Sequence, residues 1–323
     1  MLKASPNPLV KDSDSTARIM LIVCLSMIPN IIAGFLIFGY RALILYAVSV
    51  LTCVLSEHVS CMLMKKESTI KDFSAVVTGL LFAALLPVGT PLYMVIFGAI
   101  VAIVVVKMVF GGIGYNFANP AIAARIVLII AFPATMANYA VLPQYAQGSP
   151  ALSADVSNLF ADTVTSATPM ALLNDGAKLD LLGLFLGTHS GSIGEVSMLA
   201  ILIGAAILLI FGVIDLWIPL FYIGSTLVFA LLLGSDPLYN LMSGGLMLGA
   251  WYMANDYTTS PLTKQGKIVY AIGCGLITAL VRVVGFASEG VAFAILFMNL
   301  LTPLLDKVFI TKPLGGVKRF NAR

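Results

Sequence analysis

Ten apolar stretches, separated mostly by short polar connections, constrain the fold of this 323-residue chain more than any other feature. Hydrophobic residues make up 60% of the sequence and charged residues only 10%, whereas roughly a quarter of a water-soluble domain is charged. A chain with so few polar side chains cannot form a surface that faces water on all sides, so lipid must cover much of it. We therefore predict an all-α integral membrane protein with about ten transmembrane helices.

The apolar segments are expected to be helices rather than barrel strands. Inside a bilayer each segment has to satisfy its own backbone hydrogen bonds, and these segments lack the apolar–polar alternation of barrel strands. Several are close to the lower limit of about 17 residues for a spanning helix. The predicted segments cover approximately residues 19–39, 42–64, 73–87, 92–111, 118–134, 195–213, 216–233, 238–255, 267–285 and 289–305.

Lysine and arginine are distributed unevenly among the connections. If the N-terminus is cytoplasmic, the external connections carry only Arg41 and Lys178. Because cytoplasmic loops are enriched in Lys and Arg, both termini are predicted to be cytoplasmic, with residues 1–18 as a short tail rather than a cleavable signal peptide. The thirteen basic residues placed in the cytoplasm are Lys3, Lys11, Arg18, Lys65, Lys66, Lys71, Lys264, Lys267, Lys307, Lys312, Lys318, Arg319 and Arg323.

The longest connection, residues 135–194, divides the segments into five and five and is predicted to be extracytoplasmic. Residues 1–134 then form the N-terminal tail and the first five-helix repeat, and residues 195–323 form the second repeat and a cytoplasmic C-terminal tail. An odd number of helices in each half makes the two halves inverted relative to each other. Inverted repeats place functional sites near the midplane of the membrane.

Two correspondences in the sequence support an inverted repeat. Gly98 and Lys107 are nine positions apart, late in the fourth predicted helix of the first half, and Gly273 and Arg282 have the same spacing in the second half. A second correspondence is found in the third helix of each half: Thr78-Gly79-Leu80 and Ser243-Gly244-Gly245.

The charge balance and the cysteines argue against two classes of function. A net charge of +3 is too small to indicate nucleic-acid binding. All cysteines lie in apolar segments without a C-x-x-C pair, as small buried apolar residues do, so no metal site built by this chain alone is predicted. An iron–sulfur cluster shared with another subunit stays open. The cysteines are Cys24, Cys53, Cys61 and Cys274.

Charged residues inside the apolar segments are costly and are therefore candidates for function. Lys107 and Arg282 lie late in their helices, from where their side chains can also extend to the membrane interface. Arg125 has two roles open to it: neutralising helix carbonyls or a loop acid, or contacting a flavin or a phosphate. Glu57 and His58 are expected to hydrogen-bond between helices, with a proton or cation path as the alternative. The six candidates are Glu57, His58, Lys107, Arg125, Arg282 and Glu289.

The start of the fifth predicted helix is a candidate site for a cofactor or an ion. The glycines at 111, 112 and 114 and the pair Asn119-Pro120 predict an interrupted backbone, which membrane proteins tolerate where it faces protein or a cavity. An ordinary turn between helices is the alternative. The candidate cofactor contacts here are Gly112, Asn116, Asn119 and Arg125.

A string in the external loop, DTVTSATPM at 162–170, allows two compatible interpretations. Thr168 and Pro169 fit the N-cap and the first position of a helix. A helix N-terminus also suits a phosphate group, and a hydroxyl on an exposed loop is accessible to a modifying enzyme. The pattern D-x-x-T-x-A-T resembles the flavinylation motif of bacterial respiratory complexes, in which the last Thr carries FMN through a phosphoester bond.

Other strings extend this resemblance along nearly the whole chain. The chain resembles the D subunit of the Rnf electron-transport complex, a relative of the B subunit of the sodium-pumping NADH:quinone reductase. The flavin motif departs at one position, because family members often have Gly where this chain has Ser166. The strings that carry the resemblance are GGIGYNFANP (111–120) followed by Arg125, GSIGE (191–195), MANDYTTSP (253–261), RVVG (282–285) and EGVAFA (289–294).

The resemblance implies a urea-transporter-like fold of two inverted five-helix repeats in the bacterial inner membrane. It implies FMN on Thr168 at the outer face, where a flavin transferase recognises Asp162, Thr165, Ser166 and Ala167. It also implies that electrons pass from ferredoxin to NAD⁺ through membrane and peripheral partner subunits with iron–sulfur clusters and flavins, driving Na⁺ or H⁺ export. A second, non-covalent flavin such as riboflavin is implied by analogy with the sodium-pumping relative. No complete activity is expected from this chain alone.

Two other functions are alternatives. One is the quinone-reducing subunit of a sodium-pumping NADH dehydrogenase, although the roughly eighteen residues before the first helix are more similar to the Rnf branch. The other is a flavin-free channel or carrier for a small solute, which would use the inverted repeat and leave Thr165 and Thr168 as part of a helix cap. A covalently bound flavin distinguishes the carrier from the redox subunits.

Overall fold

The computed structural model describes residues 15–66, 69–137, 139–141, 164–165, 181–187, 189, 191–284 and 290–310. The elements up to the long connection are α1 (Thr16–Ser26), α2 (Ile28–Phe38), α3 (Tyr40–Leu63), η1 (Ile70–Asp72), α4 (Ser74–Ala84), α5 (Leu92–Ile100), η2 (Val101–Met108), α6 (Pro120–Ala131), α7 (Pro133–Met136) and β1 (Ala140–Val141). Those that follow are β2 (Val164–Thr165), α10 (Leu181–Leu186), α11 (Met198–Ile210), α12 (Trp217–Leu232), α13 (Pro237–Met242), α14 (Leu246–Leu248), η4 (Gly249–Met253), α15 (Lys264–Val283) and α16 (Gly290–Val308).

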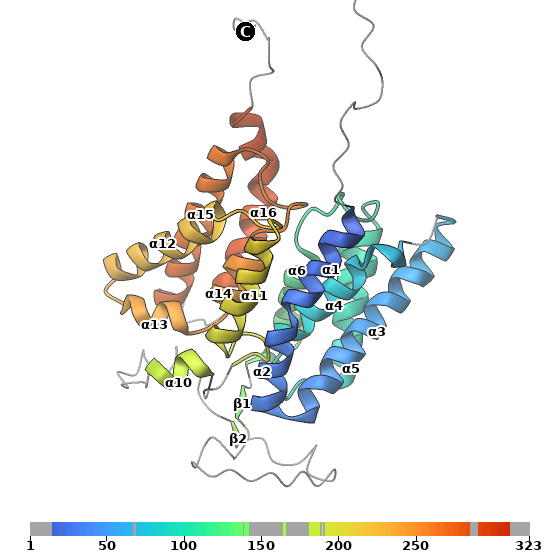
Figure 1. The fold of residues 1–323 in the computed structure, drawn as a ribbon, viewed down its shortest axis with the longest axis horizontal. Coiled ribbons are helices and arrows are strands. Elements are labelled where there is room, and N and C mark those ends of the chain that lie inside the picture. Colours follow the sequence, from blue (N-terminus) through green and yellow to red (C-terminus); the bar gives the residue numbers. More distant parts are fainter. Residues whose placement is uncertain are drawn as a thin grey trace, which may run out of the picture.

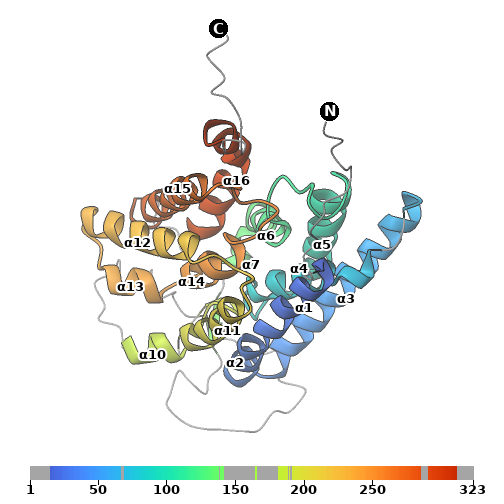
Figure 2. The ribbon, with the colours of Figure 1, turned by 45° about the horizontal axis from the view of Figure 1, so that its top comes forward.

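The two halves of the chain form two helical groups that lie side by side. Figure 2 shows the first group in blue to green and the second in yellow to red. α1 and α2 pack against α11, and α6 packs against α16, so the groups meet along these helices. In Figure 1 α1 begins and α16 ends at the same end of the molecule, and the strand pair β1–β2 lies at the opposite end.

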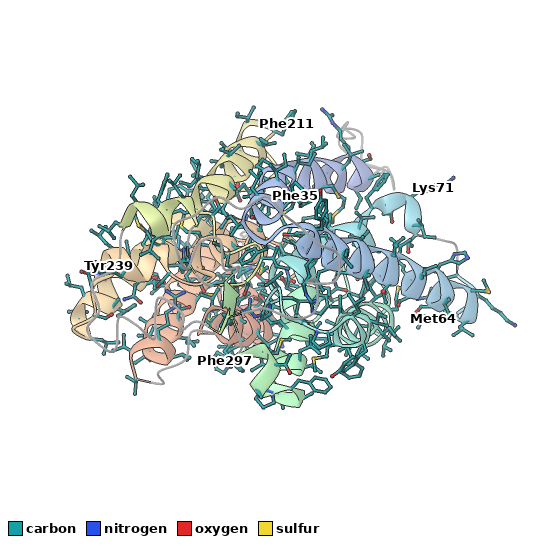
Figure 3. All side chains as sticks on the ribbon, turned by 90° about the horizontal axis from the view of Figure 1, so that it is seen from below. Phe35, Met64, Lys71, Phe211, Tyr239 and Phe297 are labelled. Carbon is teal, nitrogen blue, oxygen red and sulfur yellow. The ribbon has the colours of Figure 1, made fainter. Side chains whose placement is uncertain are left out.

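Each of the ten segments predicted from the sequence contains helix, and the chain is a multi-pass helical membrane protein. Within the described residues, four helical spans are long and apolar enough to cross a membrane: Thr16–Phe38, Tyr40–Leu63, Lys264–Val283 and Gly290–Val308. Apolar side chains also cover the periphery: Phe211 is 56% and Met64 39% exposed, and both lie at the edge of the molecule in Figure 3. Exposed apolar surface on this scale is surface that lipid or partner subunits cover.

Several of the predicted segments are shorter in the structure than a spanning helix or are interrupted, and two of them show why. α4 has 11 residues, about 16 Å at 1.5 Å per residue, which is about half the hydrocarbon thickness of a bilayer. The segment predicted at 238–255 is divided into α13, α14 and η4, and Gly244 between them has a φ of +66°. The prediction of spanning length was wrong at both places, because these helices end inside the protein, where other protein groups satisfy their backbone.

The carbonyl end of α4 is capped by the segment that precedes α11. The N–H groups of Ile193 and Gly194 donate to the carbonyls of Leu86 and Ala84 at 3.0 and 2.8 Å. The Asn30 side-chain amide on α2 donates to the Gly194 carbonyl at 3.0 Å. Since Ala84 and Leu86 are fully buried, water cannot reach these carbonyls, and the capping segment supplies the donors that a helix end requires.

The backbones of α3 and α4 approach closely at Gly79. A Cβ at Gly79 would lie 2.7 Å from the Val50 Cα, and the Ser49 hydroxyl donates to the Gly79 carbonyl at 2.7 Å.

We predict that Gly79→Ala lowers the Tm of the detergent-purified protein by several degrees, because the two backbones have to separate. Gly224→Ala in α12, where a Cβ would meet nothing within 4 Å, is the matched control and should keep or raise the Tm. Equal Tm values for the two variants would contradict this packing.

Candidate functional site

A cavity of about 80 Å³ lies between the two helical groups. The first half contributes α1, α4, η2 and the loop before α6 to its lining, and the second half contributes α11, η4 and the loop after η4. The polar side chains that matter for its chemistry are Ser74, Lys107, Asn116, Asn119, Trp251 and Asp256. The cavity therefore depends on both halves of the chain.

Two π-helical segments present side chains to this cavity. η2 continues α5 and carries Lys107, and η4 continues α14 and carries Trp251 and Tyr252. A π-helical turn contains an extra residue and is frequent at functional sites. The irregular backbone thus contributes a cation and two aromatic residues, from different halves of the chain, to the lining of one cavity.

The interruption predicted before the fifth helix is confirmed. Gly111, Gly112 and Gly114 have φ values of +129°, +106° and +86°, which residues other than glycine rarely adopt. Asn119 then starts α6 as its N-cap, because its Oδ1 accepts from the N–H groups of Ala121 and Ile122 at 3.1 and 3.4 Å. This loop turns the chain so that Asn116 and Asn119, in the later part of the loop, line the cavity.

The four cofactor contacts predicted in this region are not all at the cavity. Asn116 and Asn119 line it, whereas Gly112 and Arg125 are not among its described lining residues. The buried Asn116 Oδ1 and the Trp251 Nε1 have no hydrogen-bond partner among the described residues. One is an acceptor and the other a donor, and a buried polar atom without a partner is costly. A ligand with both a donor and an acceptor would satisfy them.

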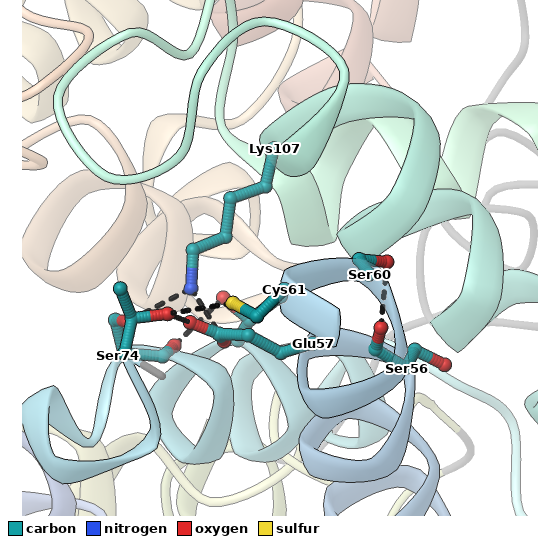
Figure 4. Close-up of polar contacts among 8 residues, drawn as sticks. Ser56, Glu57, Ser60, Cys61, Ser74 and Lys107 are labelled. Carbon is teal, nitrogen blue, oxygen red and sulfur yellow. Dashed lines mark hydrogen bonds and ion pairs between the residues drawn. The ribbon is translucent and has the colours of Figure 1, made fainter. Parts of the chain in front are cut away.

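A buried ion pair lies beside the cavity (Figure 4). Lys107 Nζ donates to Glu57 Oε2 at 2.7 Å and to Ser74 Oγ at 2.8 Å, and the Thr69 hydroxyl donates to the other carboxylate oxygen. The side chains of Lys107 and Glu57 are 3% and 0% exposed. Of the two alternatives left open for Lys107, extension to the membrane interface is not observed, because the nearby carboxylate holds the side chain inside. Glu57 forms the inter-helix contact expected of it.

Asp256 adds a carboxylate to the cavity wall, in the loop after η4. Its Oδ1 accepts from the backbone N–H and the hydroxyl of Thr258 at 3.1 and 2.9 Å. Burial raises the pKa of the Asp256 carboxyl, and the hydrogen bonds from Thr258 oppose this shift. The cavity thus combines a paired cation, an acid and uncharged polar groups.

A second buried cluster surrounds Arg125 on α6. Arg125 Nη1 donates to Glu195 Oε1 at 2.6 Å, and Nη2 donates to the hydroxyls of Tyr139 and Ser192 at 3.4 and 3.3 Å. The side chains of Arg125 and Glu195 are 4% and 8% exposed. Of the two roles considered for Arg125, pairing with a loop acid is the one observed in the described residues.

The remaining predicted residues have different outcomes. Arg282 is buried and donates to the carbonyls of Asn240 and Ser243 at 2.7 and 3.1 Å, so the alternative that it extends to the interface is not observed. Thr165 lies in β2, paired with Ala140 of β1. The residues that fall outside the described part of the chain are Asp162, Ser166, Ala167, Thr168 and Glu289.

Sequence reasoning missed the partners that complete the two clusters. The sequence analysis named Glu195 only as part of the string GSIGE that resembles the family. Glu195 is an acid at the start of an apolar segment, which is the usual signal of a buried charge. Tyr139 and Trp251 carried no comparable signal, because aromatic residues are common in membrane helices and at their ends. Their roles depend on tertiary neighbours.

Comparison with known proteins gives a consistent result. Residues 3–315 match the family described as NQR2, RnfD, RnfE. The D subunit of the Na⁺-translocating ferredoxin:NAD⁺ oxidoreductase complex of Acetobacterium woodii is 42% identical over 99% of this chain and 97% of its own length. The D subunit of the proton-translocating ferredoxin:NAD⁺ oxidoreductase complex of Clostridium ljungdahlii is 35% identical over 98% of this chain and 96% of its own length.

Repeated apolar helices, helices that end inside the protein and buried ion pairs define a multi-pass membrane protein with a polar interior. The chain belongs to the NQR2, RnfD, RnfE family. The resemblance to the D subunits of Rnf complexes, expected from the sequence strings, is confirmed over nearly the full chain.

The Glu57–Lys107 pair yields a prediction about stability. Glu57→Gln leaves the buried Lys107 ammonium without a carboxylate and should destabilise the protein by about 3 kcal/mol or more, whereas the double variant Glu57→Gln with Lys107→Met should recover much of this loss. Asp215→Asn breaks the more exposed pair with Lys267 and should cost less than about 1 kcal/mol. Thermal unfolding in detergent measures all three, and equal losses for Glu57→Gln and Asp215→Asn would contradict the burial of the pair.

Proposed function

We propose that this chain is the membrane subunit of an ion-translocating ferredoxin:NAD⁺ oxidoreductase complex and relays electrons through FMN bound covalently to Thr168. The observation that carries this proposal is the motif D-x-x-T-x-A-T, formed by Asp162, Thr165, Ala167 and Thr168, in a chain that matches the family over nearly its full length. Membership as a subunit of such a complex follows from the full-length relatives. The flavin and its attachment point are the proposed part.

The position of β2 supports attachment on the extracytoplasmic side. β2 contains Thr165 and lies at the end of the molecule opposite to the start of α1 and the end of α16 (Figure 1). The Lys and Arg distribution places the end with the start of α1 and the end of α16 on the cytoplasmic side. A transferase outside the cytoplasm would therefore have access to the loop that contains Thr168.

The coupling ion is Na⁺ or H⁺. A sodium-translocating and a proton-translocating relative are 42% and 35% identical to this chain, and these values do not separate the two ions. Partner subunits with iron–sulfur clusters and flavins would deliver and remove the electrons, and redox-linked rearrangement of the complex would drive ion export. The full-length relatives are named as subunits of ferredoxin:NAD⁺ oxidoreductase complexes, which favours this function over quinone reduction.

We assign the helices to two inverted repeats of five, as in urea transporters. In the first half Lys107 donates to Ser74, the first residue of the short helix α4. In the second half Arg282 donates to the carbonyls of Asn240 and Ser243, just before the short helix α14. A cation late in the fourth helix thus contacts the end of a short helix in each half: the start of α4 in the first half and the end of α13, which precedes α14, in the second half.

We propose that a second, non-covalent flavin binds at the cavity with only the edge of its ring inside, because about 80 Å³ is too small to enclose a whole isoalloxazine. An isoalloxazine ring has the adjacent donor and acceptor groups that the Asn116 Oδ1 and the Trp251 Nε1 lack. Lys107 would supply positive charge beside the ring, and charge near a flavin adjusts its electronics. The ring would provide reversible electron transfer. Trp251 and Tyr252 would hold it between the two halves of the chain.

The packing at the centre of the molecule favours a redox subunit over a solute channel. Glu195 and Arg125 are buried there as an ion pair, and Glu195 lies against Gly245, just before α14, where an added Cβ would collide with the Glu195 Oε1. The protein's own charged side chains therefore occupy the space between the ends of α4 and α14 that a midplane solute site would need.

The covalent flavin is tested with Thr168→Ala. The complex is purified from its native host and denatured, and flavin fluorescence is measured on the gel band of this subunit. Fluorescence should be present in the unaltered protein and lost in Thr168→Ala. Thr163→Ala, which changes a neighbouring Thr at a variable motif position, is the matched control and should keep it. An unaltered protein without fluorescence would refute the proposal and favour the carrier.

The cavity ligand is tested by the flavin that denaturation releases. We expect chromatography of the supernatant to detect free flavin, in an amount that falls in Asn116→Leu and in Trp251→Phe, because each change removes one polar group at the cavity. The fluorescent gel band should persist in both variants. If the released flavin is unchanged in both, the cavity is not its site.

A further inference from the structure

A continuous path of hydrogen bonds begins at the cavity and passes through the buried ion pair. Lys107 and Ser74 line the cavity, and Lys107 Nζ donates to Ser74 Oγ at 2.8 Å. Lys107 Nζ also donates to Glu57 Oε2 at 2.7 Å, and the Thr69 hydroxyl donates to Glu57 Oε1. Figure 4 shows the Lys107 side chain extending from η2 toward Glu57 on α3. Side chains from four parts of the chain therefore connect the cavity to Thr69.

Thr69 is the outer end of this path. It is partly exposed, whereas Glu57 and Lys107 are 0% and 2% exposed. Lys66 and Lys71, on either side of Thr69 in the sequence, are exposed, and both belong to the basic residues that the Lys and Arg distribution places in the cytoplasm. Thr69 is therefore the point at which cytoplasmic water has access to the path.

The ammonium group of Lys107 has the capacity for one more partner. An ammonium carries three N–H donors, and among the described residues two of them have partners, Glu57 and Ser74. Since Lys107 lines the cavity, the third N–H is available to an acceptor bound there. A buried ion pair is often no more stable than apolar residues in its place, whereas charged groups inside membrane proteins commonly form proton relays.

We propose that Thr69, Glu57 and Lys107 deliver protons from the cytoplasm to the ligand of the cavity when it is reduced. This inference rests on the flavin proposed for the cavity and assigns the source of its protons. The electrons come from partner subunits of the oxidoreductase complex. Each proton is supplied separately, by the side chains of this chain.

The transfer balances at each atom. Lys107 Nζ releases a proton to a ring nitrogen, and the electron pair of the broken N–H bond stays on Nζ as a neutral amine. Thr69 passes its hydroxyl proton to Glu57 Oε1 and takes another from cytoplasmic water. The Glu57 carboxyl group then turns and gives its proton to Nζ, which restores the ammonium and the carboxylate. The net change is one proton taken from the cytoplasm for each proton placed on the ring.

Asp256 is the other acid at the cavity. Its Oδ1 accepts from the backbone N–H and the hydroxyl of Thr258, two residues later in the same loop. These contacts stay within one loop, whereas the path through Glu57 joins α3, η2 and the segment before η1. Asp256→Asn therefore tests a competing proton donor.

The experiment separates the arrival of electrons from the uptake of protons. The full-length chain with Thr168→Ala, purified with its non-covalent flavin, is mixed with reduced methyl viologen, an electron donor that carries no proton. Flavin absorbance reports the electrons, and a pH-indicator dye in weak buffer reports the protons. Thr69→Val should leave electron arrival unchanged and slow proton uptake about a hundredfold, as expected for the loss of a positioned proton-transfer group. Thr69→Ser should keep the normal uptake.

Thr226→Val is the matched control. It also removes a hydroxyl, which donates to the Tyr222 carbonyl within α12 at 2.8 Å, and it should leave both rates unchanged. Normal proton uptake in Thr69→Val, equal slowing in Thr69→Val and Thr226→Val, or slowing in Asp256→Asn alone would overturn the inference. If Thr69→Val fails to fold, Thr69→Ala decides. A Thr168→Ala chain that holds no flavin refutes the proposed cavity ligand instead.

The cytoplasmic entry is tested without flavin. Thr69→Cys is made together with Cys61→Ala, because the Cys61 Sγ lies 3.6 Å from the Thr69 hydroxyl oxygen. A membrane-impermeant thiol reagent should label this variant in inverted membrane vesicles, which expose the cytoplasmic face, and should not label it in right-side-out vesicles. Thr226→Cys, at a fully buried position, should remain unlabelled in both. Labelling of Thr69→Cys from the outer face only, or from neither face, would contradict the entry of protons at Thr69.

Discussion

Helix ends that stop inside a membrane protein have to find hydrogen-bond partners without water, and this constraint shapes the interior of the molecule. The end of α4 receives the N–H groups of Ile193 and Gly194, and its start receives the Lys107 ammonium at Ser74. The carbonyls before α14 receive the Arg282 guanidinium. Lys107 and Arg282 therefore contact groups at the ends of short helices. These contacts bring polar groups of both halves into the interior of the protein.

The two candidate regions lie toward different ends of the molecule. The cavity is lined by residues at the start of α1, whereas the Arg125 cluster contacts Tyr139 beside the strand pair. If the proposed flavins are bound at the cavity and on Thr168, electrons that pass between them would cross part of the low-dielectric layer of the membrane. Each buried ion pair is a neutral unit, so it supplies local charge without adding net charge to the interior.

The sequence predicted the parts of the fold that follow from lipid and from local backbone chemistry. Apolar length predicted the helical segments, and the glycines at 111, 112 and 114 predicted the interrupted loop, which the positive φ values confirm. The short α4 and the break at Gly244 were missed, because their ends depend on donors supplied by distant segments. The pairs Glu57–Lys107 and Arg125–Glu195 join residues 50 and 70 positions apart, and no local pattern indicates which acid meets which base.

The shared lining of the cavity has a thermodynamic consequence. Because η2 and the loop before α6 line the cavity together with η4, the affinity of the cavity for any occupant depends on how the two halves are docked. Linkage is reciprocal, so a change in the charge of the occupant alters the docking equilibrium by the same free energy. A charged occupant bound between the two halves would therefore bias how they dock.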